Sequence, residues 1–172
     1  MDLLHPERYH GHRRRPPFFE GWYFKLVDAP GRARYAVIPG IFLSEDPAHH
    51  HAFVQVLDGS TGQATYHRYP AEDFRAATDR FEVHIGPNRF SLAGLELEID
   101  DDQRRVRAEV RLGTTTPWPV RPWSPGVMGP YAFIPRMECN HGVLSFDHRL
   151  DGHLTIDGAT IDLTAGRGYL EK

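Results

Sequence analysis

The chain has 172 residues, of which 40% are hydrophobic and 25% are charged, a composition typical of one globular domain with a full core. Its net charge of −3 excludes a strong electrostatic attraction to nucleic acid, and no apolar run reaches the roughly 20 residues of a transmembrane helix. Cys139 is the single cysteine and cannot form an internal disulfide, so we expect a reducing, cytoplasmic compartment.

Residues 1–17 are expected to form a lead-in segment, and residues 18–172 are expected to form a single β-domain. The lead-in contains a basic run, Arg13-Arg14-Arg15, which is followed at once by two prolines. A short run of like charges beside prolines is typical of a solvated segment, so we expect no phosphate-binding or membrane-binding role for it.

The first half of the domain contains four short segments rich in aromatic and β-branched residues, which predict strands. These segments comprise residues 22–27, 35–38, 53–57 and 65–69. Only residues 71–78 have a helical composition, and that segment is too short to organise the fold.

Three later segments alternate apolar with charged residues, which is the period-two pattern of strands buried on one face. They comprise residues 81–85, 95–99 and 106–112, and the polar run 100–103 predicts a reversal between antiparallel neighbours. Strands at such short, regular spacing favour an all-β fold, an antiparallel sandwich or barrel.

Residues 117–130 interrupt the strand pattern with five prolines, two tryptophans and two glycines. Proline lacks the N–H that a central strand must donate, so this segment cannot join the sheet. Because Trp118, Trp123 and Met128 would be costly to leave in water, we predict that the segment folds over an opening as a lid.

The C-terminal part resumes the alternation, with Leu144, Phe146, His148 and Leu150 on one face and Asp147 on the other. Two Asp-Gly pairs, at 151–152 and 157–158, are flanked by alternating apolar residues and predict a meander of three strands.

The block MGPYAFIPRMECNHGVLSFDH, residues 128–148, is the most informative part of the chain. It places Glu138, the cysteine and two histidines, His141 and His148, beside a run of apolar residues. At the lip of a β-structure, these side chains would put titratable groups next to an apolar wall. Such a site can bind a hydrophobic ligand and perform proton chemistry on it.

The chain resembles the tocopherol cyclase family, whose members look like two lipocalin-related β-domains in tandem. The resemblance rests on HPERYHGH (5–12), FFEGWYFKLV (18–27), IPGIF (38–42), AFVQVLDG (52–59), SPGVMGPYAFIPRMECNHGVLSFDH (124–148) and GRGYLEK (166–172). It implies a lipocalin-like barrel or sandwich. In the family a second β-domain follows the piece that resembles GRGYLEK, so the chain looks like the first half of a family member.

The resemblance also implies a chemistry, which is the acid-catalysed cyclisation of a prenylated hydroquinone. In this reaction the phenol oxygen adds to an alkene. It needs a positioned acid in a dry pocket, and a carboxyl group among apolar side chains has a raised pKa. The candidate catalytic residues are Glu138, Glu20, Asp147 and His148, which all fall in the matching segments.

Each candidate also has a structural interpretation. Arg136 or another arginine could pair with Glu138 as a structural ion pair, Glu20 could likewise be a paired structural charge, and His148 could be a hydrogen-bonded core histidine. The candidate ligand-binding residues are aromatic side chains and one histidine: Trp22, Tyr23, Trp123, Tyr131, Phe133, His141 and Phe146.

We expect no cofactor and no metal site. The run His49-His50-His51 follows a turn signal, and consecutive strand residues cannot all face one ion, so a solvated loop is favoured.

Two functions are therefore open. One is a cyclase-like enzyme, and the other is a carrier that binds a small hydrophobic or prenylated ligand without reaction. A homodimer that replaces the second domain of the family is a further expectation, because a half-protein would leave an exposed sheet edge.

Overall fold

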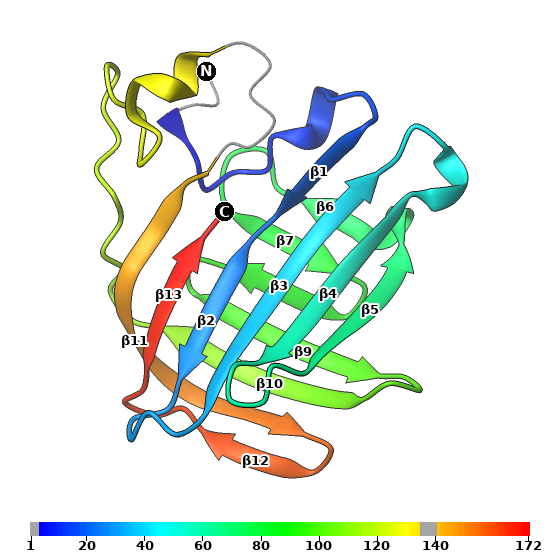
Figure 1. Cartoon of the computed structure of the whole chain (residues 1–172), viewed down its shortest axis with the longest axis vertical. Helices are drawn as coiled ribbons and strands as arrows, with labels where there is room; N and C mark the ends of the chain where they lie inside the picture. Colours follow the sequence, from blue (N-terminus) through cyan, green and yellow to red (C-terminus); the bar gives the residue numbers. More distant parts are fainter. Residues whose placement is uncertain (1–3, 135–140) are drawn as a thin grey trace.

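The computed structural model describes residues 4–134 and 141–172. It contains 52% strand and 9% helix, and the strands form one nearly closed antiparallel barrel (Figure 1). The expected all-β fold with an antiparallel barrel is confirmed.

Within the described residues, thirteen strands and four short 3-10 helices follow one another along the chain. The strands are β1 (Phe18–Gly21), β2 (Tyr23–Val27), β3 (Arg34–Leu43), β4 (His51–Asp58), β5 (Ala64–Pro70), β6 (Phe74–Ala76), β7 (Glu82–Ile85), β8 (Asn88–Ser91), β9 (Gly94–Asp100), β10 (Arg105–Leu112), β11 (Val143–Ile156), β12 (Ala159–Asp162) and β13 (Arg167–Glu171). The helices are η2 (Gly11–Arg13), η3 (Pro47–His49), η4 (Ala71–Asp73) and η5 (Gly129–Phe133).

The sheet runs in the order β5-β4-β3-β2-β13-β11-β10-β9-β8-β7-β6, with β1 beside β3 and β12 beside β11. Its two terminal strands, β5 and β6, are joined by η4. Contacts that involve side chains also link β5 to the turn between β9 and β10. His67 Nδ1 lies 2.6 Å from Asp101 Oδ2, and Gln103 Nε2 donates to the Tyr66 carbonyl at 2.8 Å.

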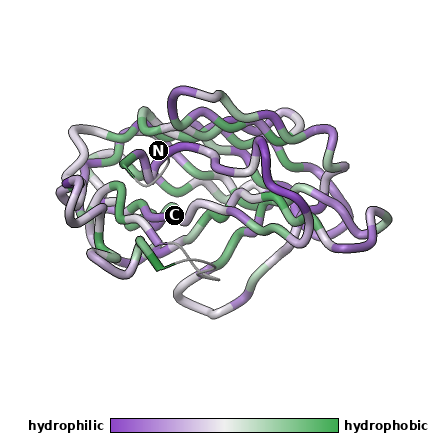
Figure 2. Tube along the Cα trace, turned by 90° about the horizontal axis from the view of Figure 1, so that it is seen from above, coloured by the Kyte–Doolittle hydropathy of each residue, from purple (hydrophilic) through white to green (hydrophobic). Residues whose placement is uncertain are grey.

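The period-two segments fold as predicted. Leu95, Leu97 and Ile99 of β9 are buried and face the interior, while the glutamates between them are exposed. Figure 2 shows this alternation of hydrophobic and hydrophilic residues along the strands. Inside the barrel the rings of Trp22 and Phe81 stack with centroids 5.0 Å apart.

The barrel interior is packed. One cluster of buried apolar side chains, which includes Trp22, Phe24 and Phe90, extends across the strands from β2 to β13. The two pockets described below lie on the outer face of the sheet. The inward positions of the described strands are thus occupied by buried apolar side chains.

The predicted three-strand meander at the C-terminus is wrong in one place. Residues 143–156 form one long strand, β11, and Asp151-Gly152 continues it opposite Val110 and Arg111 of β10. Gly152 has φ 126°, and a Cβ at this position would overlap the Glu109 carbonyl oxygen. The glycine thus permits a close strand contact, whereas Asp157-Gly158, both with positive φ, makes the predicted turn into β12.

Residues 71–78, the one segment of helical composition, do not form an α-helix. Only Ala71–Asp73 forms a short 3-10 turn, and Phe74–Ala76 pairs with β7 as β6. Pairing with β7 and packing of Phe74 against the core outweigh a weak local helical preference.

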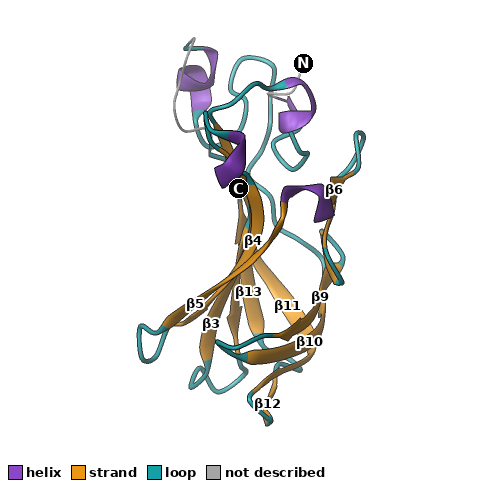
Figure 3. Ribbon diagram, turned by 90° about the vertical axis from the view of Figure 1, so that its right-hand side faces the viewer, coloured by secondary structure: helices purple, strands orange, loops and turns teal. Residues whose placement is uncertain are grey.

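The N-terminal segment closes one end of the barrel, where loops and short helices gather (Figure 3). Tyr9 packs against the core, with its ring centroid 5.0 Å from that of Phe74. Trp22 Nε1 donates to the Glu7 carbonyl at 3.1 Å. The residues of the expected lead-in from Glu7 to Gly11 are therefore part of the packed structure, and Arg13-Arg14-Arg15 is exposed.

The proline-rich segment runs along the outside of β11 and reaches the same end of the barrel (Figure 1). Its tryptophans remain exposed, with 39% of Trp118 and 69% of Trp123 accessible. The expected burial of these two tryptophans is therefore wrong for the described residues.

Candidate functional site

Four of the predicted site residues lie together on the outer face of β2, β11 and β13, in or just before these strands. They are Tyr23, His141, Phe146 and Asp147. The β13 site is defined by these four residues with Trp118, Lys25, Arg167, Tyr169 and Glu171.

Because side chains alternate along a strand, every second side chain of β2 and β13 points outward. Lys25 pairs with Tyr169 across the two strands, and Tyr23 pairs with Glu171. The inward positions between them, such as Phe24 and Leu170, are fully buried. The period of two therefore explains why a phenol, an amine and a carboxylate share one face.

A bulge in β11 brings Phe146 into the site. The pairing of β11 with β13 shifts between Ser145 and His148, so Phe146 and Asp147 both point outward. The prediction that Phe146 shares the inner face of Leu144 and His148 is wrong for this reason, and 47% of its surface is exposed.

Aromatic rings form the apolar part of the site. The ring centroid of Phe146 lies 6.4 Å from that of Tyr169 and 5.5 Å from that of Trp118. Trp118 is held there by its backbone N–H, which donates to the Val143 carbonyl at 3.2 Å. A groove of about 280 Å³ lies beside these rings, and it is lined by Lys25, Val27, Phe146, Asp147, Arg167, Gly168 and Tyr169.

A hydrogen-bonded cluster forms the polar part. The Tyr169 hydroxyl donates to Glu171 Oε2, and His141 Nε2 lies 3.2 Å from the same oxygen. Burial and the hydrogen bond to Glu171 raise the pKa of Tyr169 far above its usual range, and burial also raises the pKa of Tyr23. Both phenols are therefore neutral donors at pH 7.

Asp147 forms an exposed ion pair with Arg167. Arg167 Nε donates to Oδ1 at 2.9 Å and Nη2 lies 2.9 Å from Oδ2, a bidentate arrangement. The hydrogen bond from Arg167 holds the pKa of Asp147 below its usual value. Asp147 is consequently a carboxylate at neutral pH and not a proton donor.

His148 lies beneath the site, on the inner face of β11, and only 4% of it is exposed. Its Nδ1 lies 2.9 Å from Ser145 Oγ, and this hydroxyl donates to the Asp147 carbonyl. Because the Ser145 proton is used there, Nδ1 carries a hydrogen and donates to Oγ. Burial lowers the pKa of His148, so the neutral ring acts as a structural group at pH 7.

Glu20 and Trp22 lie elsewhere, at the end of the barrel closed by the N-terminal segment. Glu20 is 8% exposed, its Oε1 lies 2.7 Å from Lys172 Nζ, and it accepts the His10 N–H at 3.0 Å. Lys172 Nζ also lies 5.3 Å from the centre of the Trp22 ring. Glu20 has the contacts of a structural ion pair, and Trp22 is a core residue that no ligand on the outer face can touch.

The other predicted residues do not reach the groove. Trp123, Tyr131 and Phe133 are 69%, 66% and 48% exposed on the proline-rich segment. Glu138 lies outside the described residues. The three consecutive histidines diverge, since His50 Nε2 contacts the Ser44 carbonyl and His51 Nε2 contacts the Tyr66 hydroxyl.

Five residues of the β13 site were not predicted from the sequence: Lys25, Trp118, Arg167, Tyr169 and Glu171. A usable signal was present in GRGYLEK, where Arg167, Tyr169 and Glu171 occupy every second position and must share a face. The contribution of Trp118 had no such signal, because it depends on a long-range backbone hydrogen bond.

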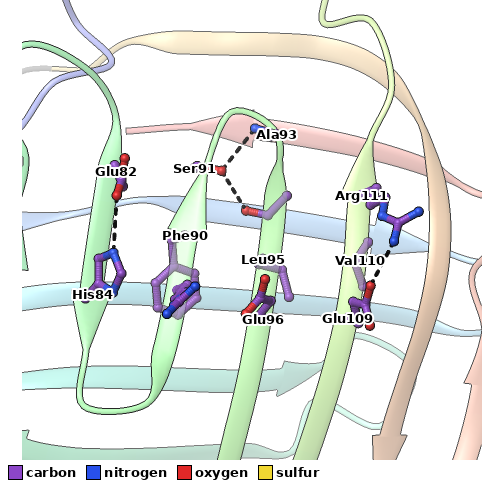
Figure 4. A pocket seen from close by; sticks show the side chains of 12 residues that line it. Glu82, His84, Phe90, Ser91, Ala93, Leu95, Glu96, Glu109, Val110 and Arg111 are labelled. Atoms are coloured by element: carbon purple, nitrogen blue, oxygen red, sulfur yellow. Dashed lines mark hydrogen bonds and ion pairs between the residues drawn. The ribbon is translucent and has the colours of Figure 1, made fainter.

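A second pocket, of about 380 Å³, lies on the outer face of β7 to β10 (Figure 4). Its charged side chains are paired locally, as with Arg111 Nη2 and Glu109 at 3.1 Å and His84 Nε2 and Glu82 at 3.4 Å. This arrangement is typical of a solvated sheet face. Across the described chain, no group of three or more His, Cys, Asp or Glu side chains is placed to hold a metal ion.

Among solved structures, the chain is similar to kievitone hydratase from Nectria haematococca, with 12% sequence identity and a TM-score of 0.43. The match covers 98% of this chain and 52% of that chain, so this chain spans about half the length of the hydratase. No family model matches the chain, and no curated protein matches it. The resemblance to the tocopherol cyclase family therefore remains a hypothesis from the sequence.

None of the helices in the described parts of the chain has the length and apolar character needed to cross a bilayer.

Proposed function

We propose that the protein binds a hydrophobic, ring-containing ligand of the prenylated quinol type at the β13 site. The observation that carries the proposal is a row of partly exposed rings, Trp118, Phe146 and Tyr169, beside a groove. The barrel interior behind this groove is packed. Rings at the edge of a groove present flat apolar faces, which favours a ligand that has a ring of its own.

The size of the groove indicates how much of a ligand it holds. Sites for drug-sized molecules enclose roughly 300–1,000 Å³, so a groove of about 280 Å³ suits one substituted ring. The tail of a prenylated ligand would lie outside it, along Trp118, which continues the aromatic row beyond Phe146.

Polar groups at the rim suit the hydroxyls of a quinol. Lys25 is exposed and lines the groove, and the Asp147–Arg167 pair provides both a donor and an acceptor next to it. A hydroxyl can donate to the carboxylate and accept from the ammonium group of Lys25. The site thus combines stacking for the ring with orientation for its substituents.

Binding without reaction is the activity that the described groups support best. Asp147 is ionised, Glu20 is in an ion pair, and His148 is neutral and faces the core. Protonation of an alkene requires a protonated group beside the substrate, and none of these three groups supplies one in the groove at neutral pH. The carrier hypothesis is therefore the primary proposal.

A cyclase-like reaction is the second candidate, and it is favoured by one pair in the site. His141 and Glu171 lie 3.2 Å apart next to the phenols of Tyr169 and Tyr23. A protonated His141 held by Glu171 could give its proton to the ligand alkene. The phenol oxygen would then bond to the cationic carbon, and its proton would return to His141.

Calorimetric titration with a short-tailed prenylated hydroquinone tests the binding site. We expect Phe146→Ala to weaken binding about tenfold, since one aromatic contact contributes on the order of 1 kcal/mol beyond its buried area. The matched control is Phe42→Ala, which removes a similarly accessible ring, 37% exposed, from β3. Equal affinity of wild-type protein and Phe146→Ala would contradict the proposed site.

Chromatography of the same mixtures separates the carrier from the enzyme. Unchanged hydroquinone after long incubation supports the carrier. Conversion to the chromanol that is lost in Glu171→Gln, with binding retained, would instead support the reaction.

A further inference from the structure

We propose that the end of the barrel that carries residues 118–134 docks onto an anionic lipid surface. The docking face is defined by Trp118, Val120, Trp123, Tyr131, Phe133 and Ile134. This inference does not depend on the ligand of the β13 site.

The docking face exposes far more apolar surface than a solvated loop requires. Trp123 and Tyr131 are 69% and 66% exposed, and Phe133 and Ile134 are both about half exposed. Several exposed apolar side chains gathered on one segment mark a contact with another phase or molecule. Between residues 114 and 134 there is a single charged residue, Arg121.

The backbone holds these side chains in their exposed positions. Arg121 and Ser124 exchange two backbone hydrogen bonds, of 3.1 and 3.0 Å, and this tight loop presents Trp123 at its tip. Tyr131 lies on η5, whose turn is closed by the Ile134 N–H donating to the Tyr131 carbonyl at 3.0 Å. Five prolines restrict the chain further, so the exposure is a built feature of the segment.

The residue types favour a membrane interface over a protein partner. Tryptophan and tyrosine combine an apolar body with a polar hydrogen-bonding edge, and they concentrate where a bilayer meets water. Trp123 and Tyr131 are the two most exposed large apolar side chains of the docking face.

Charge complementarity indicates an anionic surface. The exposed run Arg13-Arg14-Arg15 lies at the same end of the barrel as η5 (Figure 1). Gly142, which directly precedes β11, lies against Pro6 of the N-terminal segment. In a chain of net charge −3, three adjacent exposed arginines at the end of the barrel that also carries the exposed aromatic rings match lipid headgroups that carry negative charge.

Co-sedimentation with lipid vesicles tests the inference with the full chain. We expect binding to vesicles of phosphatidylcholine with phosphatidylglycerol and at least tenfold weaker binding to phosphatidylcholine alone. The double variant Trp123→Ser, Tyr131→Ser should bind the anionic vesicles at least tenfold more weakly. Replacing Arg13, Arg14 and Arg15 together by Gln should remove the preference for anionic lipid. The control Leu92→Ser alters another exposed apolar residue, 38% accessible, on the β8–β9 turn and should bind like the wild type.

Three outcomes would overturn the inference. The first is wild-type protein that stays in the supernatant with both vesicle types. The second is a double variant that binds as the wild type does. The third is sedimentation without lipid that shows a dimer abolished by Trp123→Ser, which would assign the face to a second copy of the chain. Circular dichroism of each variant checks that the barrel is intact.

Discussion

Gly168 of β13 is the position where the smallest substitution should have a large effect. A methyl group built on its Cα would lie 2.7 Å from His148 Cδ2 and 2.9 Å from Leu150 Cδ2, and closer still to His148 Nε2. Ordinary van der Waals contacts begin at 3.4 Å, so the imidazole would have to move. It cannot move freely, because Nδ1 is hydrogen-bonded to Ser145 and the ring is buried.

We therefore expect Gly168→Ala to lower the free energy of unfolding by about 2 kcal/mol, within the ~1–3 kcal/mol typical of an overpacked core. For a chain of this size, each kcal/mol corresponds to a fall in Tm of roughly 2–4 °C. Urea denaturation followed by circular dichroism measures the change. The usual gain from replacing a strand glycine by alanine has the opposite sign, so the direction alone is informative.

A double-mutant cycle identifies the cause. In a His148→Ala background the space of the ring is vacant, so adding Gly168→Ala should cost less than about 0.5 kcal/mol, and the pair should couple strongly. If Gly168→Ala costs the same in both backgrounds, the overlap with His148 is not the source of the effect and the reasoning fails.

Two further predictions concern buried ionisable groups. Burial lowers the pKa of His148 below its usual 6.5, so as the pH falls the unfolded chain is protonated at this histidine before the folded protein is. The stability contributed by the neutral ring is therefore present above pH 6.5 and is lost as the pH falls below it. The free energy of unfolding of His148→Gln, measured from acid to neutral pH, should depend less on pH than that of the wild type, and an identical profile would refute this. Lys172→Met leaves the Glu20 carboxylate buried without its ammonium partner and should lower the free energy of unfolding by about 3–5 kcal/mol. In urea denaturation, the double variant with Glu20→Gln should recover at least half of this loss. No recovery would show that the ion pair is not the source of the effect.

Much of the fold could be predicted because the sheet buries one face. In residues 95–99 and 106–112 every second side chain is apolar, and burial alone fixes the register of such strands. The two Asp-Gly pairs show the limit of local signals. The same dipeptide makes a turn at 157–158 and continues a strand at 151–152, and the choice is made by the contact with β10.

The candidate site could be predicted only in part. The motif around His141 and Phe146 is recognisable, but the bulge that turns Phe146 outward has no signal in the sequence. Glu20 shows the converse problem, since a glutamate among aromatic residues suggests an acid. Its partner, Lys172, lies more than 150 positions away, and such a pairing is a product of the tertiary fold.

The barrel wall has a seam beside β5, which pairs with β4 on one side and faces Asn88 and the β9–β10 turn on the other. Three side-chain links cross it in succession, starting from the η4 connection: Tyr69 with Asn88, His67 with Asp101, and Tyr66 with Gln103. Closure of the wall along this seam therefore depends on side chains, whereas neighbouring strands of the sheet are joined by main-chain hydrogen bonds.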